Sequence, residues 1–89
     1  DLVQNVKLAD NAIYLLTISH PYKTEMALYF IISFNAPQKI FCIYKTKNFP
    51  DNYVVINDDK TIKIGIGDEQ KNAEYLSNLT KIGRAVTLK

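Results

Sequence analysis

Residues 27–35, ALYFIISFN, constrain the fold of this chain more than any other stretch. Side chains alternate between two faces along a strand, and here both faces are apolar. One face is formed by Leu28, Phe30, Ile32 and Phe34, and the other begins with Tyr29 and Ile31. A strand of this kind is usually central in its sheet and covered on both sides. We therefore expect residues 27–35 to form a central strand whose two faces both need a covering layer.

Other segments also favour strands. Residues 12–19, AIYLLTIS, are rich in β-branched and aromatic residues, although the apolar spacing from residue 2 to residue 16 also fits a helix. Residues 39–46, KIFCIYKT, are again apolar on both faces. Residues 53–57 and 61–66 flank a polar turn, Asn-Asp-Asp-Lys, which predicts a hairpin. In its second arm, alternation predicts that Ile62, Ile64 and Ile66 face the core.

The spacing of residues 68–82 predicts a helix. Asp68 suits the N-cap, and Glu69 suits the first turn, where the helix dipole favours negative charge. Gly83 suits the position just after the helix end. Apolar residues at spacings near three and four form the predicted core stripe: Ala73, Tyr75, Leu76, Leu79 and Ile82. Residues 85–89 are interpreted as a short tail or a sixth strand.

This order of elements predicts an α+β fold: an antiparallel meander sheet of four to six strands with one C-terminal helix, about residues 68–82, packed on it. A sheet of five strands is roughly 24 Å wide. A helix of about fifteen residues is roughly 22 Å long and 10 Å across, so it cannot cover even one face. We expect the sheet to curl on itself, or a second copy or another protein to cover it.

The 89 residues are expected to form one domain, 1–89, as a processed or excised part of a longer protein, because the chain begins with Asp1. A soluble domain is expected, cytosolic or extracytoplasmic after removal of an N-terminal segment. The longest nearly uncharged run, residues 26–38, is shorter than the about 20 residues that span a bilayer.

The sequence IGIGDEQKN, residues 64–72, suggests a phosphate-binding loop because two glycines precede the predicted helix. The dinucleotide-binding pattern needs a third glycine, and Gln70 stands there instead. The carboxylates of Asp68 and Glu69 would also repel a phosphate. We interpret the stretch as a junction between a strand and a helix, and predict no cofactor.

Catalytic and metal-binding chemistry have few candidate residues. Cys42 and His20 are the only cysteine and histidine, and Cys42 in mid-strand is expected to be a buried core residue. One cysteine and one histidine do not supply a zinc site. Asp51, Asp58 and Asp59 lack the spacing of a calcium loop and are interpreted as loop and turn residues. We predict neither a catalytic nor a metal site.

The surplus of apolar strand surface predicts a non-enzymatic protein–protein interaction or assembly module that uses an apolar sheet face or edge. The partner is another protein or a second copy. The first alternative is a single-stranded nucleic-acid-binding domain, because lysines accompany aromatic residues near residues 39–47. The second is a small enzyme inhibitor. The candidate interaction surface comprises Tyr29, Ile31, Lys39, Phe41, Ile43, Tyr44, Lys45 and Lys47.

Overall fold

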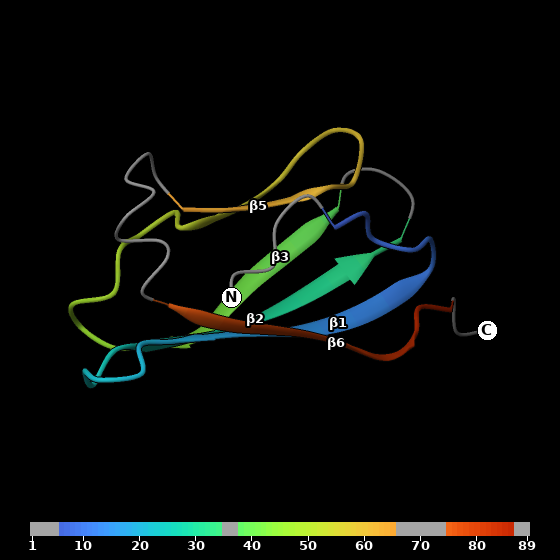
Figure 1. The fold of residues 1–89 in the computed structure, drawn as a ribbon. Coiled ribbons are helices and arrows are strands. Elements are labelled where there is room, and N and C mark those ends of the chain that lie inside the picture. Colours follow the sequence, from blue (N-terminus) through green and yellow to red (C-terminus); the bar gives the residue numbers. More distant parts are fainter. Residues whose placement is uncertain (1–5, 35–37, 66–74, 87–89) are drawn as a thin grey trace.

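The computed structural model describes residues 6–34, 38–65 and 75–86. These residues form antiparallel strands in two layers (Figure 1). One layer is a four-stranded sheet in the order β3-β2-β1-β6, and the other is a β4-β5 hairpin that crosses one face of it. The strands are β1 (Ala12–Ser19), β2 (Met26–Ser33), β3 (Lys39–Lys45), β4 (Val54–Ile56), β5 (Ile62–Ile64) and β6 (Leu76–Arg84).

The predicted α+β class is wrong for the part of the chain that the structure describes, because that part contains no helix. Residues 76–82, expected to form the second half of the helix, belong to strand β6 (Leu76–Arg84) instead. Asp68 and Glu69, expected to cap the helix, lie outside the described residues. The described chain is a small antiparallel-sheet domain.

Pairing with β1 explains why residues 76–84 are extended. β6 pairs with β1 along its whole length, from Ala12 opposite Arg84 to Ser19 opposite Leu76. Ile13 lies opposite Gly83 and Tyr14 opposite Lys81, so Ile82 is an extra residue at a β-bulge. The bulge shifts the side-chain alternation by one residue. An apolar spacing that suits a helix is therefore accommodated by a bulged strand.

The other predicted strands are confirmed within one or two residues at their ends. Residues 12–19 form β1, residues 26–33 form β2 and residues 39–45 form β3. The hairpin is also confirmed, with Ile62 and Ile64 buried and Lys63 exposed between them. Ile66 lies outside the described residues. Residues 85–86 follow β6 without continuing the strand.

The hydrophobic core lies between the two layers. Every second residue of β1 and β2, beginning at Ala12 and Ala27, is buried there. We call this side of the four-stranded sheet the inner face. The buried apolar residues that surround it are Leu8, Ala12, Tyr14, Leu16, Ile18, Ala27, Tyr29, Ile31, Phe49, Tyr53, Val54, Ile62, Ile64 and Tyr75.

Backbone hydrogen bonds extend the hairpin and join it to the segment before β1. The N–H of Gly65 donates to the carbonyl of Tyr53 at 2.8 Å, at a φ of 110° that glycine tolerates best. The segment before β1 is bonded to the hairpin as well. Leu8 N–H donates to the Lys60 carbonyl at 2.9 Å, and Ile62 N–H donates to the Val6 carbonyl at 3.0 Å. The hairpin and the segment before β1 are thus bonded to each other, and side chains from both pack in the core on the inner face.

Candidate interaction surface

The side of the four-stranded sheet that points away from the hairpin is apolar. Directly paired residues of an antiparallel sheet lie on the same face, so the register defines this surface. Ile13 pairs with Ile32, and Leu15 with Phe30. Phe30 in turn pairs with Phe41, and Leu28 with Tyr44. We call this surface the outer face: Ile13, Leu15, Leu28, Phe30, Ile32, Phe41 and Tyr44.

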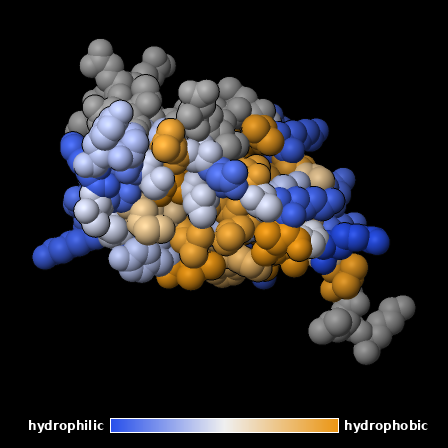
Figure 2. All heavy atoms as spheres, turned by 60° about the horizontal axis from the view of Figure 1, so that its bottom comes forward, coloured by the Kyte–Doolittle hydropathy of each residue, from blue (hydrophilic) through white to orange (hydrophobic). Residues whose placement is uncertain are grey.

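No element of the described residues covers the outer face. Its residues on β1 and β2 are half-buried by their neighbours, whereas 51% of Phe41 and 54% of Tyr44 is exposed. Figure 2 brings this underside of the sheet forward, and apolar side chains gather across it. Residues 27–35 were expected to lie centrally and to be covered on both faces. β2 is indeed an inner strand, but only one of its faces is covered within the described residues.

The outer face carries little charge. Among the residues of β1, β2 and β3 that the register places on this side, the only ionised side chain is that of Lys39, opposite Ile32 at the sheet edge. A nearly uncharged apolar surface has a low desolvation cost when another apolar surface covers it. The outer face therefore has the chemistry of a contact surface.

The structure separates the predicted interaction residues into two groups. Tyr29 and Ile31 lie on the inner face, 6% and 0% exposed, and are core residues. Burial raises the pKa of Tyr29 to about 12, with smaller contributions from Cys42, Asp51 and Tyr53. Neither residue is available to a partner, and we omit both from the interaction surface.

The other predicted residues lie on or just after β3, and most are exposed. Phe41 and Tyr44 belong to the outer face, and Ile43, 56% exposed, is the extra residue at a register shift in β3. Lys39 and Lys47 are exposed at the two ends of the strand. Lys45 is half-buried, because its Nζ lies 2.9 Å from Asp51 Oδ1 and donates to the Phe49 carbonyl at 3.2 Å.

Cys42 is exposed, and the expectation of a buried cysteine is wrong. It lies opposite Tyr29, on the side of β3 that faces the hairpin layer. β3 is an edge strand, however, and its central residues remain exposed. The Cys42 thiol donates a long hydrogen bond to the Tyr44 carbonyl at 3.6 Å.

An aromatic cluster lies outside the predicted surface. Phe49, Tyr53 and Tyr75 pack edge to face with ring centroids 5.1–5.5 Å apart, and His20 adds a fourth ring 5.6 Å from Tyr75. The Tyr75 hydroxyl donates to Glu25 Oε2 at 3.2 Å. Sequence reasoning missed this cluster because its rings come from three separate segments, after β1, between β3 and β4, and before β6. Its main rings are buried, so it stabilises one end of the core rather than forming a surface.

The described residues contain no group of three or more His, Cys, Asp or Glu side chains that could hold a metal ion. Within the same ranges, no helix has the length and apolar character needed to cross a membrane.

No family model, curated protein or solved structure matches this chain. We therefore infer its function from the chemistry of its surfaces.

Proposed function

We propose that this chain is a non-enzymatic protein interaction module, and that its outer face binds the partner. The observation that supports the proposal is the sheet itself. It carries large apolar side chains on both faces, and the described residues cover only one of them. An enzyme inhibitor would be one case of such a module.

The size of the outer face supports this proposal. Three strands at about 4.8 Å spacing and eight residues at about 3.3 Å span roughly 14 by 26 Å, or about 400 Å². The largest apolar patch on a typical monomer is about 300–600 Å², and such patches are often functional. Counted over both partners, an interface of this area is about 800 Å², which is below the standard size and suits a weak or transient contact.

The test compares residues on the two sides of the molecule. Leu15→Thr combined with Phe30→Thr makes the outer face more polar while keeping residues that suit strands. Val55→Thr is the control, because Val55 is exposed on β4 opposite Lys63 and away from the outer face. Binding of an apolar fluorescent dye and the molar mass from light scattering are measured for all three proteins.

The proposal predicts that the wild-type protein binds the dye or self-associates at high concentration. The outer-face variant is expected to lose most of this behaviour, and the Val55→Thr variant to retain it. A strictly monomeric wild-type protein without dye binding would contradict the proposal.

A second candidate is binding of single-stranded nucleic acid. Phe41 and Tyr44 are exposed aromatic residues on the same face as Lys39, and bases stack on such rings beside basic groups. The pairing of Lys45 with Asp51 weakens this candidate, because a phosphate would have to compete with that carboxylate. If nucleic acid binds, its affinity is expected to fall steeply as salt concentration rises. Affinity for a protein through the outer face is expected to change little with salt.

A further inference from the structure

We propose that the free edge of β3 accepts an extended segment of a partner protein as an additional strand. The segment is apolar in its centre and carries a carboxylate side chain at each end. This inference rests on the proposed function and names both a place on the molecule and the chemistry of its partner. It concerns the edge of the sheet, whereas the proposal above concerns its outer face.

The edge of β3 is open. β3 is the first strand of the sheet order, and within the described residues it pairs only with β2. The backbone N–H and C=O groups on its other side are therefore free to pair with an extended peptide. Lys39–Cys42 pair regularly with β2, and the register shift comes only after Cys42. A regular stretch of edge is thus present before the bulge.

Positive charge stands at both ends of this edge. Lys39 begins β3 and Lys47 follows its last residue by two positions, and both are exposed. Lys45 is already paired with Asp51, so its charge is compensated. β3 itself contains no carboxylate. One lysine at each end suits a segment with a carboxylate at each end, whichever direction the segment runs.

The same charges disfavour a second copy of this chain at the edge. Antiparallel pairing of two β3 strands centred on Ile43 would bring Lys39 of each copy near Lys47 of the other, and both lysines are exposed. The opposite edge of the sheet, β6, carries Lys81 and Arg84 and no carboxylate. Like charges directly opposite each other destabilise a strand pair. Both edges therefore repel copies of this chain, and β3 attracts an acidic strand.

The centre of β3 favours apolar side chains. Phe41, Ile43 and Tyr44 are each more than half exposed. In a strand added beside β3, side chains on one side would lie next to Phe41 and Tyr44 and extend the outer face. β6 has a more polar centre, with Ser77, Asn78 and Thr80. This difference distinguishes β3 from the other edge.

The experiment uses a displayed library of nine-residue segments, the span from Lys39 to Lys47. Apolar and threonine residues alternate in the centre, and each end position carries either glutamate or lysine with equal frequency. Selection on the intact protein is expected to enrich segments with glutamate at both ends. The most enriched segment is then synthesised, and its affinity is measured by fluorescence anisotropy.

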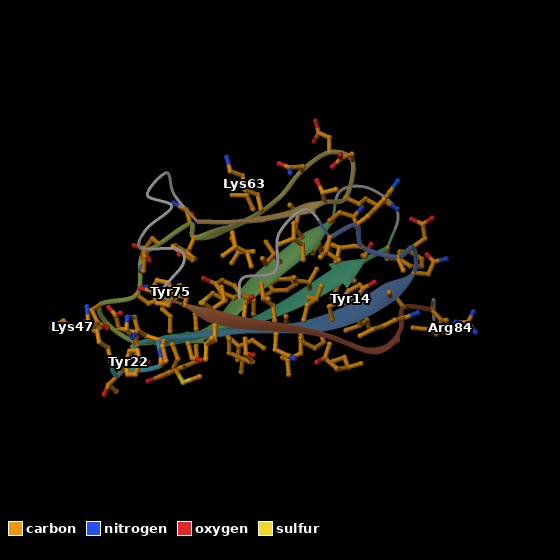
Figure 3. The ribbon with its side chains drawn as sticks, viewed as in Figure 1. Tyr14, Tyr22, Lys47, Lys63, Tyr75 and Arg84 are labelled. Atoms are coloured by element: carbon orange, nitrogen blue, oxygen red, sulfur yellow. The ribbon has the colours of Figure 1, made fainter. Side chains whose placement is uncertain are left out.

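Two charge-reversed proteins provide the matched comparison. Lys39→Glu combined with Lys47→Glu reverses the charges at the ends of β3. Lys63→Glu reverses a lysine on the exposed side of the hairpin, which Figure 3 places on the opposite side of the molecule from the outer face. The double variant is expected to bind the glutamate-ended peptide roughly ten- to thirtyfold more weakly and to prefer the lysine-ended one. The Lys63→Glu variant is expected to bind as the wild type does.

Cys42 reports where the peptide binds. It is the only cysteine of the chain, it is exposed, and it lies in the middle of β3. Its rate of reaction with a thiol reagent is expected to fall severalfold when the glutamate-ended peptide is bound.

The inference is overturned if no segment is enriched, if lysine-ended and glutamate-ended segments are enriched equally, or if peptide binding leaves the Cys42 reaction rate unchanged. Loss of affinity in the Lys63→Glu variant equal to that in the double variant would also overturn it. None of these outcomes affects the dye binding that tests the outer face, so failure of this inference is distinguishable from failure of the proposed function.

Discussion

The two faces of the four-stranded sheet have similar apolar composition and different surroundings. Leu15 and Leu16 are neighbours on β1, yet Leu16 is fully buried on the inner face and Leu15 is half-buried on the outer face. Ile31 and Ile32 on β2 show the same contrast. Residue type therefore does not decide which face forms the core.

What differs is the layer above each face. The β4-β5 hairpin and the segment before β1 cover the inner face through buried apolar side chains, and backbone hydrogen bonds from Gly65, Leu8 and Ile62 hold these two parts together. Nothing among the described residues plays this role for the outer face. The comparison teaches that an apolar face becomes a core where another layer covers it, and stays partly exposed where the described residues supply no such layer.

The largest expected difference in stability is between two leucine-to-alanine variants, one on each face of the sheet. Leu16→Ala should lower the free energy of unfolding by about 2–5 kcal/mol, because it removes buried contacts and leaves a cavity. Leu15→Ala should lower it by about 1 kcal/mol, because much of that side chain already contacts solvent. Urea denaturation of both variants measures the difference. Equal losses would show that the outer face is covered in solution.

A second comparison uses the buried hydroxyl of Tyr29. Its pKa is raised to about 12, mainly by burial, from an ordinary value of 10.0. Between these two values the unfolded chain loses the proton and the folded protein keeps it, so stability falls as pH rises through this window. Because solvent screening weakens the effect of burial on the ionised form, we expect the loss to be about 1 kcal/mol.

The matched variant is Tyr29→Phe, which has no hydroxyl to ionise. Its free energy of unfolding should fall less steeply than that of the wild type between pH 10 and pH 12. Denaturation curves across that range provide the measurement. Parallel losses in the two proteins would mean that the Tyr29 hydroxyl is accessible to water, and that the inner face is less well covered than described.

The third prediction concerns the β4-β5 hairpin that covers the inner face. Gly65 has a φ of 110°, where a side chain is strained, and its N–H bond to Tyr53 extends the β4-β5 ladder. Gly65→Ala should cost about 1–3 kcal/mol of stability. Gly83 on β6 provides the control, because an added methyl group there meets nothing within 4 Å. Gly83→Ala should leave stability nearly unchanged, and equal thermal unfolding temperatures for the two variants would contradict this account.

Much of the sheet was predictable from local sequence. The strands at residues 12–19, 26–33 and 39–45 and the hairpin follow from β-branched residues, alternation and turn residues. The surplus of apolar strand surface also predicted that one helix could not cover the sheet; the described residues contain no helix, and they leave the outer face uncovered. The exposure of residues in β3 was harder to predict from sequence. Cys42 is exposed because β3 lies at the edge of the sheet, and the sequence does not show which strand is at the edge.

The strand at residues 76–84 could not be predicted from local sequence because its conformation depends on a distant strand. Leu76, Leu79 and Ile82 have a helical spacing, and only pairing with β1, some sixty residues earlier, makes that stretch extended. Leu76 and Leu79 lie on opposite faces of the sheet, paired with Ser19 and Leu16, so the stretch lacks the two-residue apolar alternation that would have indicated a strand. The exclusion of Tyr29 and Ile31 from the surface has a similar origin. Sequence shows that both faces of β2 are apolar, but the hairpin decides which of them is covered.

The smallest expected effect on stability concerns the turn of the hairpin, between β4 and β5. The Asp59 carboxylate accepts hydrogen bonds from the Thr61 hydroxyl at 2.5 Å and from the Thr61 N–H at 3.1 Å, and these bonds lower its pKa below the ordinary 3.8. Because the carboxyl has a lower pKa in the folded protein than in the unfolded chain, its ionisation stabilises the fold at pH values above the ordinary pKa. This stabilisation is lost as the pH falls through the pKa of the folded protein.

Asp59→Asn removes this titration while keeping an oxygen that can accept from Thr61. The variant should be slightly less stable than the wild type at neutral pH, and the difference should shrink below pH 3.8. Asp58→Asn, at the neighbouring exposed position of the same turn, is the control for the change in net charge. If both variants showed the same pH dependence, the Asp59–Thr61 bonds would contribute nothing to holding the hairpin in place. The cover of the inner face would then depend on Gly65, Leu8 and Ile62 without help from its turn.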